Sequence, residues 1–266
     1  NVYMKMIVSD LDGTLFNSDR HDYEISKELI SEIQQFKEKG NIFTIATGRP
    51  IETSIEVAKN IGVNAPYISY NGAKIVDIYG NEIYSEDFKL DIWFPFLNNI
   101  KDIGATIIFY HNGDVFCLEK TDEIYNYEKK EKTKCSEISK EMLNSSLKVN
   151  KILIIGKVEN YINMWIQLNE NILREFKYII SEDNYFEIVK SNVSKGNALK
   201  ILKKYLNIND NQVISIGNHM NDKELIEEAH IGYAVANATE KLKSIADFIT
   251  YKEYEQGVIE VIKKYS

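Results

Sequence analysis

The sequence predicts an α/β protein in which an α+β unit interrupts a core built around a parallel sheet. Short apolar segments alternate with amphipathic helical segments near both ends of the chain, an order that implies parallel strands joined by right-handed crossovers. This alternation is lost in the middle of the chain, where the pattern is that of a separate unit. We therefore expect a discontinuous core, residues 1–86 and 190–266, and an inserted domain, residues 87–189.

The first part of the chain carries two strand-helix pairs. The apolar run Met4 to Val8 predicts a buried strand, and the apolar spacing within Ile25 to Lys39, followed by Gly40 at a cap position, predicts a helix. Ile42 to Ala46 is short, apolar and β-branched, which predicts the second strand. The remaining elements expected here are a helix from Ile51, a strand over Tyr67 to Tyr70 and a hairpin around Tyr79-Gly80-Asn81.

The middle segment predicts helices and hairpins in a different order. Asn112-Gly113 stands between two β-rich runs, and Asn-Gly is a strong turn signal, so residues 106–110 and 115–119 are expected to form a hairpin. The other elements expected are helices over Leu90 to Ile103, Thr121 to Lys132 and Glu159 to Glu170, and strands over Lys151 to Ile155, Tyr178 to Ser181 and Tyr185 to Val189. Because the segment contains no dense cluster of candidate catalytic groups, we interpret it as an insertion.

The strand-helix alternation returns after Ser191. The expected elements are, in order, a helix over Lys195 to Leu206, a strand over Val213 to Ile216, a helix over Asp222 to Ala229, a strand over Tyr233 to Val235, a helix over Thr239 to Ala246, a strand over Phe248 to Thr250 and a helix from Gly257. Ligand sites of parallel α/β sheets collect at the carboxyl ends of the strands. The residues that follow the predicted strands are therefore the candidates for function.

Charge and hydropathy exclude several classes of partner. The chain has 40 acidic and 32 basic residues, a formal net charge of −8, which argues against a general affinity for nucleic acid or anionic membranes. No apolar run approaches the roughly 20 residues that span a bilayer. The two cysteines, Cys117 and Cys135, have neither metal-site spacing nor a disulfide framework. We expect a cytoplasmic protein that binds neither nucleic acid nor membranes.

The pentapeptide Asp10-Leu11-Asp12-Gly13-Thr14 carries the strongest chemical signal. Two carboxylates two positions apart, at a strand end and before a glycine turn, form an anionic pocket suited to a divalent cation. A carboxylate can attack phosphorus once magnesium offsets the repulsion between the two anions, and a second carboxylate can transfer the proton of the leaving group. A calcium loop is excluded because the glycine stands at position four rather than six. An ordinary acidic turn stays open for this motif taken alone.

Three further polar patches fall at predicted strand ends or helix starts. They are Thr47 to Arg49, Lys195 to Gly196, and Asn218 to Asp222. Phosphoryl transfer needs a nucleophile, a hydroxyl and backbone amides that hold phosphate oxygens, a cation that offsets their charge, and oxygen ligands for the metal. The four patches together supply each of these groups.

In order and spacing, the motifs resemble those of the haloacid dehalogenase superfamily of phosphatases, specifically the Cof-type branch of subclass IIB. The motifs are DLDGT from Asp10, ATGR from Ala46, NGA from Asn71, SKG from Ser194 and G-x-x-x-N-D from Gly217. The resemblance covers nearly the whole chain. It implies a Rossmann-like parallel-sheet core with an inserted α/β cap domain, Mg2+ as cofactor, and a small phosphorylated metabolite, such as a sugar phosphate or a phosphorylated cofactor, as substrate. The protein is expected to be a monomer or a homodimer.

The resemblance also implies a role for each motif residue. Asp10 is the nucleophile that becomes an aspartyl-phosphate, and Asp12 is the general acid and base. The residues implied for the phosphate are Leu11, Thr47, Gly48, Lys195 and Asn221, and those implied for the metal are Asp10, Asp12, Asn218 and Asp222. Asn218 departs from the family, which usually has Asp there as a direct magnesium ligand. An amide oxygen brings no negative charge, so we expect weaker magnesium binding unless Asp222 compensates.

Some alternatives remain open from the sequence. The chain can be a non-catalytic or weakly active regulatory protein that binds a phosphometabolite, in which Asn218 marks the loss of efficient metal use, or a phosphomutase, which keeps the phosphate on the substrate. Arg49 can bind phosphate or form a structural ion pair. Asn71 can line the site or only shape its turn, because Asn tolerates a left-handed backbone.

Overall fold

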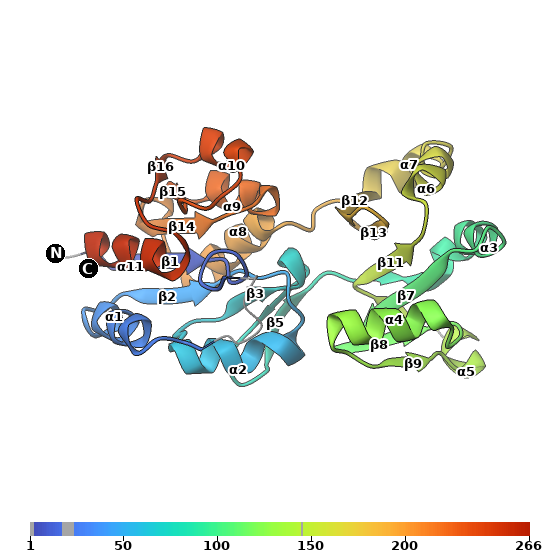
Figure 1. The fold of residues 1–266 in the computed structure, drawn as a ribbon, viewed down its shortest axis with the longest axis horizontal. Helices are drawn as coiled ribbons and strands as arrows, with labels where there is room; N and C mark the ends of the chain where they lie inside the picture. Colours follow the sequence, from blue (N-terminus) through green and yellow to red (C-terminus); the bar gives the residue numbers. More distant parts are fainter. Residues whose placement is uncertain (1–2, 18–23, 145) are drawn as a thin grey trace. The chain divides into compact units, whose positions relative to one another are not determined.

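The chain folds into two compact units (Figure 1). The structure, a computed structural model, describes residues 3–17, 24–144 and 146–266. Unit 1 comprises Asn1–Ser85 and Val193–Ser266, and unit 2 comprises Glu86–Asn192. Among the described residues, no helix has both the length and the apolar character needed to cross a membrane.

A five-stranded parallel sheet forms the centre of unit 1. Its strands are β1 (Met6–Ser9), β2 (Ile42–Ile45), β14 (Val213–Gly217), β15 (Ile231–Ala234) and β16 (Phe248–Ile249). Their order in the sheet is β16-β15-β14-β1-β2. Met6 is in register with Val213 on one side and with Ile42 on the other, so β1 has a parallel neighbour on each side. This sheet confirms the predicted α/β fold class.

Helices cover both faces of the parallel sheet. The helices of unit 1 are α1 (Lys27–Glu38), α2 (Ile51–Ile61), α8 (Lys195–Leu206), α9 (Lys223–Glu228), α10 (Glu240–Ile245) and α11 (Tyr254–Tyr265). Successive side chains of a strand point to opposite faces. Ile7 accordingly packs with side chains of α1, α2, α10 and α11, whereas Met6 and Val8 pack with α8 and with Leu225 of α9. Apolar parallel strands are thereby shielded from water on both sides.

A small antiparallel sheet completes unit 1. Its strands are β3 (Tyr67–Ser69), β4 (Lys74–Val76) and β5 (Glu82–Ser85), and the 3-10 turn η1 (Tyr70–Gly72) connects the first two. A parallel bridge between Ala46 and Ile68 joins the end of β2 to β3. This bridge places the end of β3 next to Thr47. The turn η1, which follows β3, therefore begins close to the Thr47 motif.

Unit 2 is an α+β unit with a mostly antiparallel six-stranded sheet of order β12-β13-β11-β7-β8-β9. The strands of unit 2 are β6 (Phe88–Lys89), β7 (Thr106–His111), β8 (Asp114–Cys117), β9 (Cys135–Glu137), β10 (Lys148–Val149), β11 (Lys151–Ile155), β12 (Phe176–Glu182) and β13 (Tyr185–Lys190). Its helices are α3 (Phe94–Lys101), α4 (Asp122–Glu131), α5 (Lys140–Asn144), α6 (Val158–Trp165) and α7 (Glu170–Glu175). The predicted hairpin across Asn112-Gly113 is β7-β8.

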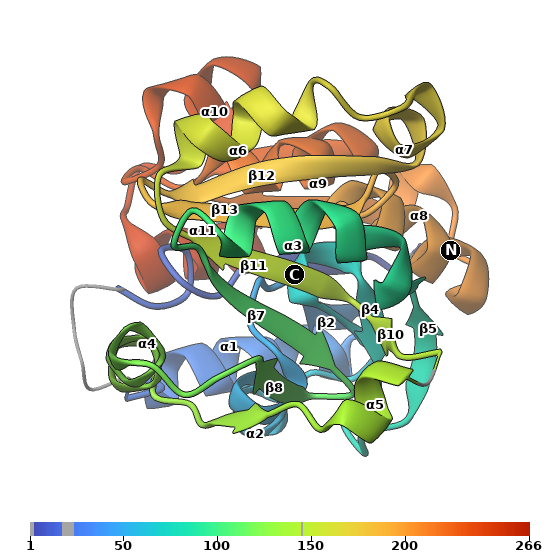
Figure 2. The ribbon, with the colours of Figure 1, turned by 90° about the vertical axis from the view of Figure 1, so that its right-hand side faces the viewer.

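Aromatic rings fill the core of unit 2. Figure 2 shows α3 lying across the strands β7 and β11, and side chains of α3 and α6 pack with those of the sheet in one apolar cluster. Within it the rings of Trp93 and Trp165 stack with centroids 5.3 Å apart, and Phe176 meets Trp93 edge to face at 5.1 Å. Such pairs add stabilisation beyond their buried area.

The structure differs from the prediction in several short elements of unit 2. The helix expected over 159–170 ends already at Trp165, and a second helix, α7, begins at Glu170, where the Asn169 side chain accepts a hydrogen bond from the Ile172 amide. The helix expected from Leu90 begins as a 3-10 turn, and α3 starts only at Phe94. The elements β6, β9, β10 and α5 were not predicted, since two to five residues carry too little periodicity.

Candidate active site

Three of the predicted motifs follow neighbouring strands at one edge of the parallel sheet. Ser9 is in register with Ile45 of β2 and with Ile216 of β14. The residues that come next, Asp10 and Thr47 among them, therefore emerge at the same edge. The Asp10 amide donates to the Ile216 carbonyl at 3.0 Å, which continues the strand pairing up to the first motif.

Lys195 binds two carboxylates in the interior of unit 1. Its Nζ donates to Asp10 Oδ1 at 2.9 Å and to Asp222 Oδ1 at 2.7 Å, and all three side chains are buried. Burial and the charge of Asp222 raise the pKa of Asp10 to about 7, although Lys195 acts in the opposite direction. Burial alone would lower the pKa of Lys195, but the two carboxylates outweigh it and raise that pKa. Lys195 is thus a permanently charged neighbour of Asp10.

The second oxygen of Asp222 holds the loop that follows β14. Asp222 Oδ2 accepts hydrogen bonds from the amides of Asn218 at 2.9 Å and His219 at 3.3 Å. Gly217 permits this close approach, because a Cβ there would lie 2.6 Å from the Asp222 side chain. Both oxygens of Asp222 are therefore engaged, one by Lys195 and the other by the Asn218 loop.

Asp10 and Asn218 present oxygen atoms to a common neighbour. Thr14 Oγ1 lies 3.4 Å from Asp10 Oδ2 and 3.1 Å from Asn218 Oδ1. The amide of Asn218 packs on Gly13, whose φ of +83° and lack of a Cβ leave the space, since a Cβ would meet Asn218 Nδ2 at 2.1 Å. Carboxylate and amide oxygens are ligands for a hard cation. No group of three or more His, Cys, Asp or Glu with metal-site geometry occurs within residues 3–17, 24–144 and 146–266.

Asp12 forms a two-armed ion pair with Arg49. Arg49 Nη2 donates to Asp12 Oδ1 and Nε to Asp12 Oδ2, each at 2.7 Å, and Nη1 donates to the Thr53 carbonyl at 3.0 Å. The guanidinium also lies over the Phe16 ring at 5.9 Å. A planar fork of this kind fixes the orientation of a carboxylate. The sequence left two roles open for Arg49, phosphate binding and a structural ion pair. In the structure Arg49 forms the ion pair.

The predicted phosphate-binding residues lie around this centre. Thr47 is buried, and its Oγ1 accepts a hydrogen bond from the Arg49 amide at 3.0 Å, which leaves the hydroxyl hydrogen available for another acceptor. Gly48 is exposed directly after it. The Leu11 amide hydrogen-bonds the Asp10 carboxylate and acts to lower its pKa. Asn221 is exposed, and its Nδ2 donates to Asn71 Oδ1 at 3.3 Å.

Two residues of this region, Thr14 and Asn237, were not among the predicted site residues. Thr14 links Asp10 to Asn218, which is 204 positions away. Asn237 donates from Nδ2 to the Gly13 carbonyl at 2.8 Å and accepts from the Tyr254 amide at 2.9 Å, so it ties the glycine turn to the start of α11. Only Thr14 had a usable hint, since it ends the DLDGT motif.

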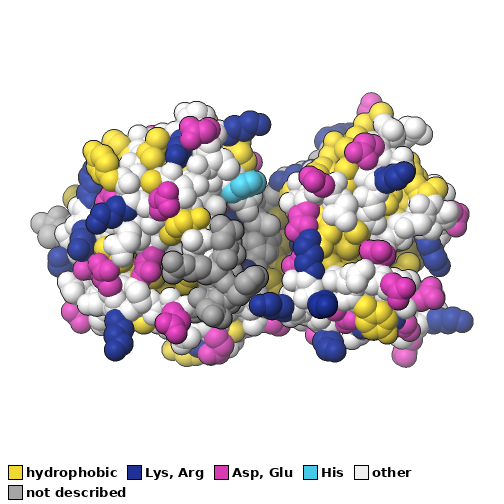
Figure 3. Space-filling view, in the orientation of Figure 1, with side chains coloured by type: hydrophobic (Ala, Val, Ile, Leu, Met, Phe, Trp, Pro, Cys, Tyr) yellow, Lys and Arg dark blue, Asp and Glu magenta, His cyan; other side chains and the backbone are white. Residues whose placement is uncertain are grey.

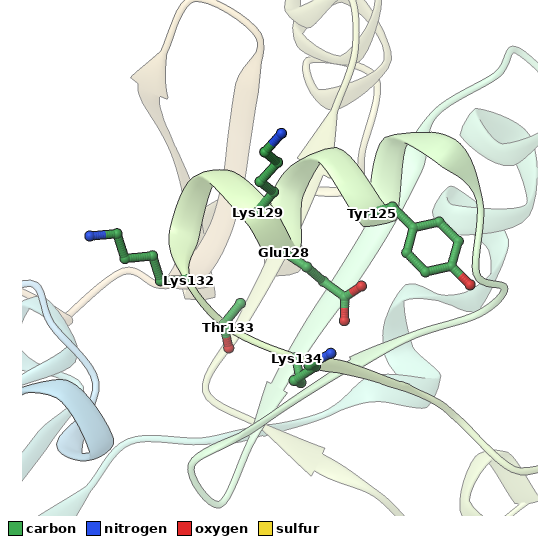
Figure 4. Close-up of a pocket in the computed structure, with 6 residues that line it drawn as sticks. All are labelled: Tyr125, Glu128, Lys129, Lys132, Thr133 and Lys134. Atoms are coloured by element: carbon green, nitrogen blue, oxygen red, sulfur yellow. The ribbon is translucent and has the colours of Figure 1, made fainter.

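A pocket in unit 2 contains none of these residues. It lies at the end of α4 and is lined by Tyr125, Glu128, Lys129, Lys132, Thr133 and Lys134 (Figure 4). Figure 4 shows that Lys129 and Lys132 point away from each other, so their charges do not converge on one ligand. Figure 3 likewise shows acidic and basic side chains interspersed over the visible face of each unit.

Comparison with known proteins identifies the family. Residues 7–262 match the sequence model of the haloacid dehalogenase-like hydrolases. The chain belongs to this family. It is 27% identical to Phosphatase YwpJ of Bacillus subtilis, over 98% of this chain and 99% of that protein. It is 26% identical to the 5-amino-6-(5-phospho-D-ribitylamino)uracil phosphatase YitU of the same organism, over 98% of this chain and 97% of that protein.

A solved structure of similar fold is that of TM0651 from Thermotoga maritima. It superposes with a TM-score of 0.84, is 27% identical in sequence, and the match covers 99% of this chain and 98% of that one. The family match confirms the resemblance inferred from the motifs and the expected class of enzyme, a haloacid dehalogenase-like hydrolase. The relatives named as phosphatases support phosphatase activity within that class.

Proposed function

We propose that this hydrolase is a Mg2+-dependent phosphatase that removes phosphate from a small phosphorylated metabolite through an aspartyl-phosphate on Asp10. The observation that carries the proposal is the buried Lys195, which binds Asp10 and Asp222 at the edge of the sheet where Thr47 and Asn218 also lie. A buried lysine between two carboxylates is costly to keep. Chemistry at Asp10 gives a reason for this cost.

The side chains fit a magnesium ion. Asp10 and Asn218 offer oxygens that approach the same Thr14 hydroxyl, and Asp12 is close in sequence. Asp222 supports this ligand set indirectly, since it holds the Asn218 loop and Lys195. When bound, Mg2+ supplies positive charge that offsets the repulsion between a carboxylate and a phosphate and lowers the pKa of the carboxylate.

The phosphate is held while Asp10 attacks. In the proposed reaction, a carboxylate oxygen of Asp10 forms a bond to phosphorus as the bond to the substrate oxygen breaks. Lys195 neutralises the phosphoryl charge and orients Asp10. The hydrogen-bond donors to the phosphoryl oxygens are the amides of Leu11 and Gly48, the Thr47 hydroxyl and the Asn221 side chain.

Asp12 transfers the protons. It protonates the departing substrate oxygen and then removes a proton from the water that hydrolyses the aspartyl-phosphate. The fork of Arg49 fixes the direction of the Asp12 carboxylate, with two contacts at 2.7 Å. Asp12 thus passes from acid to base within one cycle.

Unit 2 is proposed to be the cap, the domain expected over residues 87–189. Caps and lids exclude bulk water from the reacting groups. A small metabolite as substrate is supported by YitU, whose name gives a phosphorylated ribityl compound as its substrate. Sugar phosphates and phosphorylated cofactors are therefore the substrates to test.

The decisive experiment measures phosphate release from p-nitrophenyl phosphate across a range of Mg2+ concentrations, for the natural chain and for Asp10→Asn. We expect kcat to fall at least about a thousandfold in the variant, since it loses its nucleophile. Asp183→Asn is the matched control, because Asp183 is exposed in unit 2.

Three outcomes separate the alternatives. Absence of turnover at every Mg2+ concentration, with phosphate still bound, favours the regulatory binding protein. Conversion of a sugar phosphate to an isomer without phosphate release favours the phosphomutase. Turnover that persists in Asp10→Asn contradicts Asp10 as the nucleophile.

A further inference from the structure

The turn η1 has an unusual backbone beside the proposed phosphate site. Tyr70, Asn71 and Gly72 all have positive φ, at 50°, 55° and 103°. Glycine adopts this conformation freely, Asn tolerates it, and a bulky residue such as Tyr rarely does. Such strain at a residue other than glycine persists only where the surroundings enforce it.

The surroundings of η1 are two of the proposed phosphate motifs. The Asn71 amide donates to the Thr47 carbonyl at 3.0 Å, and the Tyr70 amide donates to the Arg49 carbonyl at 3.1 Å. On its other side Gly72 packs on the start of α8, where a Cβ would lie 2.0 Å from the Ser194 carbonyl oxygen and 3.0 Å from the Lys195 amide nitrogen. The turn η1 therefore packs between the Thr47 motif and the Lys195 motif.

This backbone places the Asn71 side chain against Gly48. A Cβ at Gly48 would lie 2.9 Å from Asn71 Oδ1 and 3.2 Å from Nδ2, so glycine leaves the space that the amide occupies. Asn221 Nδ2 donates to Asn71 Oδ1 at 3.3 Å. That bond engages the oxygen of Asn71, and the Nδ2 hydrogens have no partner among the residues that the structure describes.

Several hydrogen-bond donors consequently gather here without an acceptor in the described part of the chain. They are the Asn71 Nδ2 group, the amide of Gly48, against which Asn71 packs, and the hydroxyl hydrogen of Thr47. Uncommitted donors beside a lysine suit an oxyanion, because each donor gains an acceptor when the anion binds. We propose that Asn71 is a further phosphate-binding residue, with Asn221 orienting its amide so that Nδ2 donates to a phosphoryl oxygen. The inference rests on the proposed function, because it adds a ligand to the same site.

Asn71→Gly tests the amide separately from the backbone. Glycine keeps the left-handed conformation and removes only the side chain. A hydrogen bond to a charged group contributes about 1.5–3 kcal/mol. We therefore expect the Kd of inorganic phosphate, measured by calorimetry, and the KM of p-nitrophenyl phosphate each to rise about tenfold or more, with kcat within about twofold. Asn71→Asp should weaken phosphate binding further, because it places a negative charge beside the anion.

Asn112→Gly is the matched control. Asn112 is also left-handed, with φ 47°, but lies in the β7-β8 turn of unit 2. This variant should leave the Kd and the KM unchanged. Circular dichroism checks that both variants fold.

The inference is overturned if Asn71→Gly binds phosphate as tightly as the natural chain, while Asn71→Ala loses stability. Asn71 would then serve only to form the turn. Failure of the proposed function has different signatures, namely no turnover at any Mg2+ concentration, conversion of a sugar phosphate without phosphate release, or turnover that does not depend on Asp10. The calorimetric Kd tests Asn71 even in that case, because it needs no turnover.

Discussion

The two units of the protein bury different kinds of side chain at their centres. Unit 1 encloses Lys195 with Asp10 and Asp222, whereas unit 2 encloses an aromatic cluster around Trp93 and Trp165. Removing charges from water costs several kcal/mol per ion before pairing offsets it, and aromatic packing is favourable without such a penalty. The buried charges of unit 1 fit the chemistry proposed for Asp10, whereas the aromatic cluster of unit 2 contributes stability.

Helix α8 carries two lysines whose ion pairs differ in burial. Lys195 at its start pairs with two buried carboxylates, whose side chains are 7% and 0% exposed. Lys203, two turns later, pairs with Asp210 at 2.7 Å and Glu228 at 2.8 Å, and the Asp210 side chain is 85% exposed. Carboxylates that water can reach lose little when their partner is removed. The two lysines therefore form a matched pair for experiment.

Lys195→Met should have the largest effect. The change removes the Lys195 ammonium group that pairs with the buried carboxylates of Asp10 and Asp222. We therefore expect a loss of about 3–5 kcal/mol in the free energy of unfolding and loss of measurable turnover. Urea denaturation followed by circular dichroism gives the first quantity, and phosphate release gives the second. Lys203→Met should cost only about 1 kcal/mol or less and retain activity. Equal costs for the two variants would contradict the distinction between a functional and a structural lysine.

Trp165→Ala should have the largest effect on unit 2. Its ring contacts Trp93, Phe96, Tyr178 and Phe186, and truncation of a large buried aromatic side chain costs about 3–5 kcal/mol. Both tryptophans of the chain lie in unit 2, so the fluorescence of the remaining Trp93 reports the unfolding of that unit. We expect the urea midpoint of this fluorescence to fall while inorganic phosphate binds as before under native conditions. A parallel loss of phosphate affinity would show that unit 2 supports the unit 1 site directly.

Local signals explain which parts of the fold could be predicted. The helix expected over Lys195 to Leu206 has those bounds in the structure, because Ser194 caps its start and Asn207 ends it in a left-handed conformation. The prediction extended the helix over 159–170 too far, because apolar residues continue past the end of α6 at Trp165. The start of α7 is marked only by the cap at Asn169, a single side-chain contact. Apolar periodicity therefore located the elements but not every break between them.

The site divides in a similar way. Residues such as Asp10 and Lys195 stand in short motifs at strand ends or helix starts, so the sequence already proposed that they meet. The partners of these residues were harder to predict, because the Thr14 to Asn218 contact spans 204 positions and the Arg49 to Asp12 pair spans 37. Those pairings depend on the strand order and register of the sheet, which a single sequence does not specify.

Asn218→Asp tests how added negative charge in unit 1 changes stability and Mg2+ affinity. A carboxylate at this position adds a negative charge beside Asp10 and Asp222, so the free energy of unfolding should fall in the absence of Mg2+. In its presence, Mg2+ affinity should rise about tenfold, which equals about 1.4 kcal/mol. Thermal denaturation across a Mg2+ titration measures both effects, and Asn112→Asp in the exposed turn of unit 2 is the control. An unchanged titration would show that position 218 is not a metal ligand.

Arg49→Lys should have the smallest effect, and it separates proton transfer from phosphate binding. Lysine keeps the charge but offers Asp12 one contact in place of the two at 2.7 Å. Water partly screens this pair, since the Asp12 side chain is 37% exposed, so loss of one contact corresponds to about 1 kcal/mol. We therefore expect kcat to fall about fivefold while the Kd of inorganic phosphate stays the same. Arg174→Lys is the control, since Arg174 lies on α7 of unit 2 and its side chain donates to Asn171 Oδ1 at 3.2 Å. If the phosphate Kd rises and kcat does not change, Arg49 acts on the phosphate, and the ion pair with Asp12 gives way when the substrate binds.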